Sequence, residues 1–368
     1  MGAFHSLLLA QPRNQKRFET HTPIVLLVTP PLIDDVKIDI SHHSRPKHTH
    51  DGDEATNKYE VISTKPSHPC RPGASLAEVL ASTSVTKCAP IQKIFSYEHA
   101  YDSDIIAHWR LTERCNLPNP SYMKLQPIIT VDIRELAVDW MVDVQLQYDL
   151  QEESLFLAVN LFDRILGKYT VTCKNLQLLA CTVLWIASKY EEGPLAPHID
   201  DLLSACACNP FKQSAVIATE QAVLTVLQFK LASPLSIHFL QYFSRCCDLS
   251  IGGNTWHMAL YFLELTLQFY IFLEFHPSKL AASALYLAMN TAQGSNQDLH
   301  VWSTAQEQLI AYTTDAIASC VCAMYSSIHE LETQSNLYQT VKYKFLSEKY
   351  DGVAKQKCRK PSMVDNGR

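Results

Sequence analysis

The stretch LQLLACTVLWIASKYEE (residues 176–192) decides the fold of this chain. As far as Ala187 its only polar residues are Gln177 and Thr182, and no Gly or Pro interrupts it. An apolar run of this length is too long for an ordinary strand, so it predicts a helix. Because such a helix is apolar on every side, other helices must pack around it. The run then ends in a charged Lys-Tyr-Glu-Glu tip, which we expect to reach the surface.

The composition limits the class of protein. The chain has 368 residues, is 47% hydrophobic and 18% charged, and carries a formal net charge of -6. This length allows two or three domains, and the hydrophobic share is enough for a sizeable core. Binding to nucleic acid phosphates requires a basic face, so the acidic balance argues against nucleic acid as the main partner.

The twelve cysteines do not have the spacing of metal ligands, because no C-x-x-C occurs. Most lie in apolar stretches and are interpreted as core residues in a reducing compartment, so we expect no metal and no cofactor. No signal peptide is convincing. The most apolar stretch of helical length, residues 256–275, carries Glu264 and Glu274. It is therefore predicted to be a core helix, and we expect no association with a membrane.

Residues 1–98 differ from the rest of the chain. They hold nine of the 18 prolines and many polar residues, with only short apolar islands. Such a segment cannot bury enough apolar surface to offset its ordering entropy, and we expect a mostly disordered tail. The histidines at positions 42, 43, 48 and 50 could bind a metal weakly, but a solvated polar tail is the preferred interpretation.

Residues 128–331 show long helical periods, and no stretch alternates as a strand does. We expect helices at residues 133–147, 152–167, 173–192, 199–205 and 211–228, and again at 234–247, 255–275, 277–291, 303–312 and 315–330. The second set repeats the first, since LAASALYLAM (residues 280–289) matches LACTVLWIAS (residues 179–188) in its Leu and Ala positions. The sequence therefore predicts an all-α fold in which a five-helix unit occurs twice, each around a buried third helix.

No nucleophile–base motif, phosphate-binding Gly loop or paired-carboxylate motif stands out, so an enzyme is not expected. Arg134 and Asp163 form a different kind of pair. If residues 133–147 and 152–167 form an antiparallel hairpin, these two side chains lie nearly opposite each other. We interpret them as a structural ion pair that helps to specify the fold.

The residues also carry a family resemblance. Four blocks resemble, in order and spacing, the first cyclin box: IRELAVDWMVDV (133–144), LFLAVNLFDRIL (155–166), KNLQLLACTVLWIASKYEE (174–192) and TEQAVLTVLQFKL (219–231). SYMKLQPIIT (residues 121–130) and YKFLSEKYDGVA (residues 343–354) are similar to the flanking segments of A-type cyclins. The chain is thus identified as A-type cyclin-like, a subfamily that acts in S phase and mitosis.

The resemblance implies two tandem five-helix cyclin boxes, preceded by a short N-terminal helix and a disordered tail. The implied domains are a tail (1–98), an N-terminal helix and lead-in (99–127), a first box that binds a kinase (128–231), a second box (232–331) and a C-terminal segment (332–368).

The resemblance further implies a regulatory subunit, itself not an enzyme, that binds and activates a cyclin-dependent serine/threonine kinase in cell-cycle control. In this family the first box docks on the kinase's mobile helix and brings its glutamate to the catalytic lysine. Lys189 and Glu220 match the family's kinase-contact pair, with Tyr190, Glu191 and Phe229 at the rim. A nuclear and cytoplasmic location is expected.

The family also carries a patch that recruits substrates or inhibitors with a basic-hydrophobic docking motif. It maps to Ile133, Leu136, Ala137, Trp140, Asp143, Leu176 and Gln177. Ala137 and Asp143 are shorter than the residues usual there, which predicts weak recruitment. We expect Ile133, Leu136 and Trp140 to form an accessible ridge; the alternative is that these apolar residues are core.

Two other classes stay open. A cyclin-fold transcription adaptor that bridges DNA and polymerase would need a basic surface and usually a zinc ribbon. The acidic charge and the absence of C-x-x-C count against it. A free-standing enzyme is the third alternative, and no motif supports it.

Overall fold

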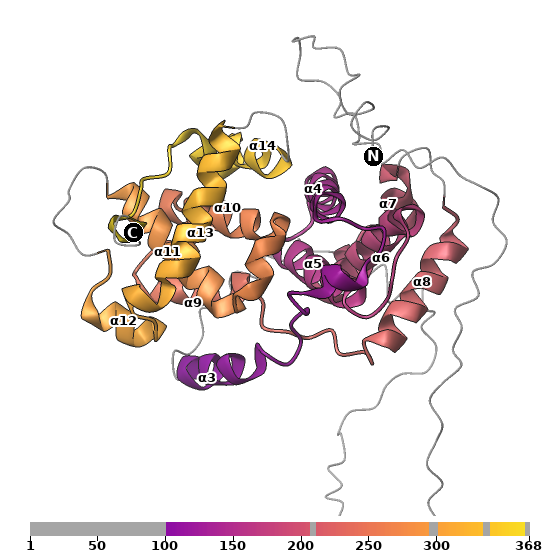
Figure 1. Cartoon of the computed structure of the whole chain (residues 1–368), viewed down its shortest axis with the longest axis horizontal. Coiled ribbons are helices and arrows are strands. Elements are labelled where there is room, and N and C mark those ends of the chain that lie inside the picture. The colour runs from indigo at the N-terminus through magenta and orange to yellow at the C-terminus, as the bar shows by residue number, and fades with distance from the viewer. Residues whose placement is uncertain (1–100, 207–210, 294–300, 334–338, 365–368) are drawn as a thin grey trace, which may run out of the picture. The chain divides into compact units, whose positions relative to one another are not determined.

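The computed structural model describes residues 101–206, 211–293, 301–333 and 339–364. The described residues from 104 onward belong to one compact unit of α-helices and short 3-10 helices (Figure 1). No strand occurs among the described residues, so the predicted all-α class is confirmed. The tail predicted at residues 1–98, with its histidines, lies outside the described residues.

The first bundle is built around the helix that the opening stretch predicts. It contains α4 (Val131–Gln147), α5 (Glu152–Leu166), α6 (Cys173–Glu191), α7 (Ile199–Ala205) and α8 (Gln213–Val226). Helix α6 contacts each of the other four, and its side chains at Ala180, Val183, Leu184 and Ala187 are buried. An apolar helix enclosed by its neighbours is the expected arrangement, and it is confirmed.

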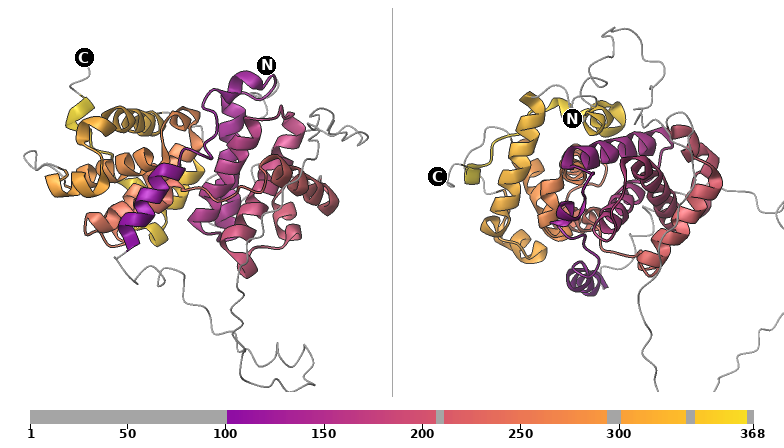
Figure 2. Two further views of the ribbon diagram at one scale, coloured as in Figure 1. Left: turned by 90° about the horizontal axis from the view of Figure 1, so that it is seen from below. Right: turned by 45° about the vertical axis from the view of Figure 1, so that its right-hand side comes forward.

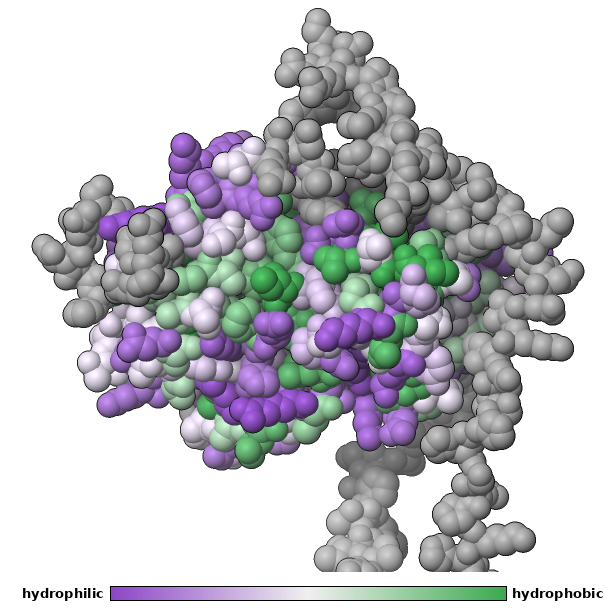
Figure 3. All heavy atoms as spheres, in the orientation of Figure 1, coloured by the Kyte–Doolittle hydropathy of each residue, from purple (hydrophilic) through white to green (hydrophobic). Residues whose placement is uncertain are grey.

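The second bundle repeats this plan. It contains α9 (Ser236–Cys246), α10 (Asn254–Gln268), α11 (Pro277–Ala292), α12 (Thr304–Ile310) and α13 (Thr314–Thr333). Helix α11 contacts α9, α10 and α13, and it buries Ala281, Leu285 and Ala288. The predicted repeat is therefore present. On the face drawn in Figure 3, hydrophobic side chains interspersed with hydrophilic ones extend from the region where the bundles meet onto the first bundle.

One predicted helix is wrong in its length. The helix expected at residues 255–275 ends at Gln268, and a 3-10 helix, η5 (Tyr270–Glu274), follows. The reason is a contact from the first bundle: Nη1 of Arg134 donates to the carbonyl oxygens of Leu267 at 2.7 Å and Gln268 at 2.5 Å. These carbonyls would otherwise bond the next helical turn, so the guanidinium acts as a cap.

The same arginine forms the predicted ion pair. Its Nε and Nη2 donate to the two carboxylate oxygens of Asp163 at 3.0 and 2.6 Å, and both side chains are buried. The hydroxyl of Tyr122, in the 3-10 helix η3 (Tyr122–Leu125), donates to Asp163 at 2.7 Å. A bidentate pair with further hydrogen bonds is the arrangement in which a buried charge is best compensated.

The N-terminal helix, α3 (Asp102–Thr112), packs on the second bundle rather than on the first (Figure 2). The guanidinium carbon of Arg110 lies 4.4 Å from the ring centroid of Tyr312. Just beyond the helix, the carboxylate of Glu113 accepts from the backbone N–H and the hydroxyl of Ser278, at 3.0 and 2.9 Å. The segment that precedes the first bundle in the sequence is thus anchored to the second.

The C-terminal segment joins the two bundles. It consists of α14 (Thr340–Leu346), η6 (Glu348–Tyr350), η7 (Val353–Lys355) and η8 (Ser362–Val364). Helix α14 contacts both α4 and α10. The buried ammonium of Lys344 donates to Glu264 on α10 at 2.5 Å and to Gln145 on α4 at 3.0 Å. Thr340 donates to Asp139 on α4 at 2.7 Å.

No single helix in the described ranges is long and apolar enough to cross a membrane, whereas the bent pair α12 and α13 passes by length and composition alone.

We predict that Arg134→Met destabilises the fold by about 3–5 kcal/mol, because it leaves the Asp163 carboxylate buried without its cation. The matched control is Lys349→Met. Lys349 pairs with Asp149 at 2.7 Å, but both side chains are exposed, so the cost should stay below about 1 kcal/mol. Equilibrium unfolding in guanidinium chloride measures both values. If Arg134→Met lowered the free energy of unfolding by no more than Lys349→Met does, the buried pair would not be needed for stability.

Candidate partner-binding site

Lys189 and Glu220 lie side by side at the surface of the first bundle. Helix α6 is mostly buried between Leu176 and Ser188 and becomes exposed at Lys189, whose ammonium donates to the carboxylate of Glu220 on α8. The ammonium nitrogen also lies 3.3 Å from the ring centroid of Trp185, one turn earlier on α6. A cation held by both a carboxylate and an aromatic face has a fixed position. The structure therefore presents this pair as a pre-ordered charged feature.

Large apolar side chains stand exposed on the same bundle. Tyr190 follows Lys189, Leu195 ends the 3-10 helix η4 (Gly193–Leu195), and Phe229 follows α8. Leu195 is 75% and Phe229 72% exposed. Single exposed apolar residues are common, but several on the elements that follow an ordered ion pair are consistent with a protein-binding surface. Leu195 was not predicted, although its place in a Gly-Pro loop directly after the matched block 174–192 was a usable signal.

The backbone at the end of α8 is unusual. Gln228 and Phe229 have φ of 54° and 57°, in the left-handed region that residues other than glycine seldom adopt. The N–H of Phe229 donates to the carbonyl of Leu224 at 2.9 Å, which closes the turn. Such a conformation costs on the order of 1–3 kcal/mol for each residue and persists where the surroundings determine it. It turns the chain sharply and leaves the Phe229 ring in solvent.

Carboxylates gather where α6 meets α5. Glu192 accepts from the backbone N–H of Gln151 at 3.2 Å and from the hydroxyl of Ser154 at 2.6 Å, which ties the two helix ends together. Burial raises the pKa of Glu191 to about 7, and the nearby charges of Glu153 and Glu192 raise it further. A positive group on a partner would relieve this repulsion, so the rim of the surface favours a basic neighbour.

The predicted recruitment patch is divided by the structure. Ile133, Leu136 and Asp143 on α4 are half-buried. The remaining members are buried: Ala137, Trp140, Leu176 and Gln177. The expectation that the Trp140 indole is accessible is wrong, because this residue is only 1% exposed. Helix α4 has α5, α6, α10 and α14 as neighbours, so its buried surface extends over more than one side.

Two buried donors in this region lack a partner. Nε1 of Trp140 and Nε2 of Gln177 have no hydrogen-bond acceptor among the residues that the structure describes. A buried donor without an acceptor costs about 1–3 kcal/mol and calls for an explanation, such as a ligand or an ordered water. By contrast, Arg134 and Asp163 are buried inside the fold, where they are satisfied by each other, by the hydroxyl of Tyr122 and by the carbonyls at the end of α10.

The described residues do not include a group of three or more His, Cys, Asp or Glu side chains that could hold a metal ion. What the surface of the first bundle offers is an ion pair, exposed apolar side chains and an acidic rim. These are means of binding another macromolecule.

The chain matches two protein families. Residues 104–232 match the family described as "Cyclin, N-terminal domain", and residues 234–359 match "Cyclin, C-terminal domain". Among solved structures, a viral cyclin from herpesvirus saimiri aligns with a TM-score of 0.55 at 20% identity, over 61% of this chain and 97% of that one. This likeness concerns the fold alone.

Curated relatives are more similar in sequence. "G2/mitotic-specific cyclin-B" of Hydra vulgaris is 34% identical over 250 residues, 68% of this chain and 66% of the relative. "Cyclin-A2-1" of Oryza sativa subsp. japonica is 33% identical over 259 residues, which are 69% of this chain and 51% of the relative. The matched region thus spans about half to two thirds of these relatives. Both matching domains lie in tandem within the all-α unit described above. The chain belongs to the cyclin family, with similarity to its A-type and B-type members.

Proposed function

We propose that this chain is a regulatory subunit, without catalytic activity of its own, that binds and activates a cyclin-dependent serine/threonine kinase in cell-cycle control. The observation that carries the proposal is the Lys189–Glu220 pair on α6 and α8, followed along the chain by the exposed side chains of Tyr190, Leu195 and Phe229. The names of the relatives support a role in the mitotic cell cycle. A location in both nucleus and cytoplasm is part of this proposal.

In the proposed complex, the mobile helix of the kinase packs on the apolar side chains of the first bundle. The charged pair fixes the register of this contact, because a misplaced partner would desolvate Lys189 and Glu220 without compensation. Docking then favours the kinase conformation in which the helix glutamate meets the catalytic lysine, as in other two-state activation mechanisms. The bundle itself needs little rearrangement, since α6 is enclosed by packed helices.

The finer part of the proposal is recruitment of substrates or inhibitors that carry a basic-hydrophobic docking motif. Half-buried Ile133 and Leu136 provide an apolar surface for the hydrophobic residue of the motif. The unsatisfied donors of Trp140 and Gln177 lie among the residues of the same patch and could bond peptide carbonyl oxygens. Trp140 then acts from beneath the surface and not as an exposed ridge.

The alternative of an adaptor that bridges DNA and polymerase is not favoured. The curated relatives named above are cell-cycle cyclins, and the chain carries a net charge of -6. A protein with this charge has no general attraction to DNA phosphates.

We predict that Lys189→Ala and Glu220→Ala each weaken kinase binding by at least about tenfold, because either leaves its partner charge unpaired in a desolvated interface. The kinase is first captured by pull-down and purified, and affinity is then measured by calorimetry together with phosphorylation of a short peptide. Lys349→Ala, in the exposed pair with Asp149, is the control and should bind normally. Normal binding by both interface variants, or kinase activity of the isolated chain, would overturn the proposal.

A second prediction concerns the patch. Leu136→Asp should slow phosphorylation of substrates that carry a basic-hydrophobic docking motif, because packing the apolar residue of the motif there would desolvate the carboxylate. Phosphorylation of a short peptide without the motif should be unchanged. Trp140→Ala should instead lower the free energy of unfolding by about 3–5 kcal/mol, as expected for a large buried side chain. Competition assays and thermal unfolding separate the two effects. Equal slowing of both substrates by Leu136→Asp would remove the patch from the proposal.

A further inference from the structure

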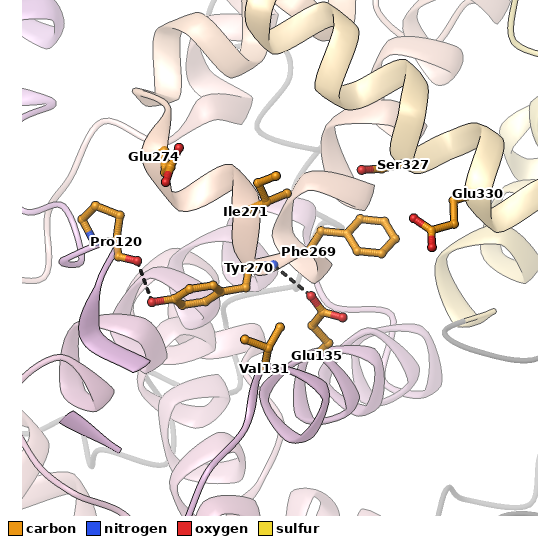
Figure 4. Close-up of a pocket in the computed structure, with 9 residues that line it drawn as sticks. All are labelled: Pro120, Val131, Glu135, Phe269, Tyr270, Ile271, Glu274, Ser327 and Glu330. Carbon is orange, nitrogen blue, oxygen red and sulfur yellow. Dashed lines mark hydrogen bonds between the residues drawn. The ribbon is translucent and has the colours of Figure 1, made fainter. Parts of the chain in front are cut away.

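A pocket of about 390 Å3 opens where the two bundles meet, away from the elements that carry Lys189 and Glu220 (Figure 4). Its walls come from the first turns of α4, from η5 and from α13. Val131, Phe269 and Ile271 supply apolar surface, and Glu135, Glu274 and Glu330 supply carboxylates. A volume of this size falls within the range of about 300–1,000 Å3 that is usual for ligand sites.

The pocket is held open by hydrogen bonds around Tyr270. The hydroxyl of Tyr270 donates to the carbonyl of Pro120 at 2.6 Å and accepts from the N–H of Met123 at 3.2 Å. Its backbone N–H donates to Oε1 of Glu135 at 3.1 Å, as the dashed line in Figure 4 shows. The ring of Tyr122 packs edge-on against the Tyr270 ring, with centroids 5.2 Å apart. A site fixed in this way is formed before any ligand arrives.

The charges in the pocket are of one sign. No Lys, Arg or His is found among the described residues that line it. Glu135 is only 8% exposed, and burial raises the pKa of its carboxyl; the charges of Asp132 and Glu330 act in the same direction, and the N–H of Tyr270 and the charge of buried Arg134 offset part of the rise. Carboxylates that repel one another across a half-open space gain when a cation lies between them.

The geometry indicates which kind of cation fits. Among the described residues there is no group of three or more His, Cys, Asp or Glu side chains that could hold a metal ion. An arginine side chain matches better, because its planar guanidinium carries five donors that can reach separate carboxylates. Its alkyl stem can lie along Val131 and Phe269. Ile271, which is 55% exposed at this site, adds apolar surface for a neighbouring residue of the same peptide.

We propose that this pocket is a second docking site, which takes an arginine next to an apolar residue on a segment of a partner protein. It is distinct from the recruitment patch: Val131 and Glu135 lie one helical turn apart on one side of α4, whereas Ile133 and Leu136 lie on another. It does not depend on kinase binding, because the elements of the pocket are not those that carry the charged pair.

The test uses the full chain with isoleucine methyl groups labelled for NMR. Ile271 reports on the pocket and Ile133 on the recruitment patch, with the two signals assigned by Ile271→Val and Ile133→Val. The probe is the capped peptide Gly-Phe-Arg-Gly-Gly, which has no apolar residue two places after its arginine. We expect a saturable shift of the Ile271 signal and none of the Ile133 signal. The same peptide with citrulline, which is similar in shape but uncharged, should bind at least about tenfold more weakly.

Substitutions of single glutamates test which carboxylates bind the arginine of the peptide. Glu274→Gln and Glu135→Gln should each weaken the peptide at least about fivefold, and the glutamine at position 135 still offers an oxygen to the N–H of Tyr270. Glu348→Gln, at an exposed glutamate on η6, is the matched control and should change nothing. Equal binding of the citrulline peptide, a shift of Ile133 in place of Ile271, or no saturable shift would overturn this inference. None of these results bears on kinase activation, which is measured separately.

Discussion

The fold depends on the buried guanidinium of Arg134. A cation taken out of water is tolerated only when its donors are used, and here the fork is divided between two bundles. One side holds Asp163 on α5, and the remaining nitrogen holds the carbonyls of Leu267 and Gln268 at the end of α10. Neither set of bonds alone uses all the donors of the buried guanidinium. The arginine is therefore compensated only when α4, α5 and α10 are all in place, and this couples the two bundles.

The hydrogen bonds of Arg134 also determine the structure at the end of α10 and in η5. Because α10 must end at Gln268 to release its carbonyls, η5 begins there and carries Tyr270 into contact with Glu135 and the lead-in segment. The ammonium of Lys344, from the C-terminal segment, donates to Gln145 near the other end of α4 and to Glu264, one turn before the end of α10, and so also links the two bundles. Buried polar groups of this kind contribute more to a unique arrangement than to stability. The pocket at η5 is a direct result of that arrangement.

The sequence was informative where local pattern decides the structure. An apolar run without breakers could only be an enclosed helix, and a short connection placed Arg134 opposite Asp163. The end of α10 was not predictable, because residues 255–275 contain no Gly or Pro and the break is imposed by a residue far earlier in the chain. Trp140 was misjudged for a similar reason. A stripe on α4 shows which side is apolar, but not that α10 and α14 also pack on this helix.

On the surface of the first bundle, the sequence predicted the charged residues but not the backbone conformation beside them. Lys189 and Glu220 were found from motifs, whereas the left-handed backbone of Gln228 and Phe229 has no signature in the sequence. That backbone is unfavourable, and so is an aromatic ring left in water, yet the turn is closed by a good hydrogen bond to Leu224. A fold stabilised elsewhere by enclosed helices can carry such a cost. Under the proposed function, burial of the Phe229 ring against the kinase offsets this cost, so a conformation that is unfavourable in the isolated chain favours association.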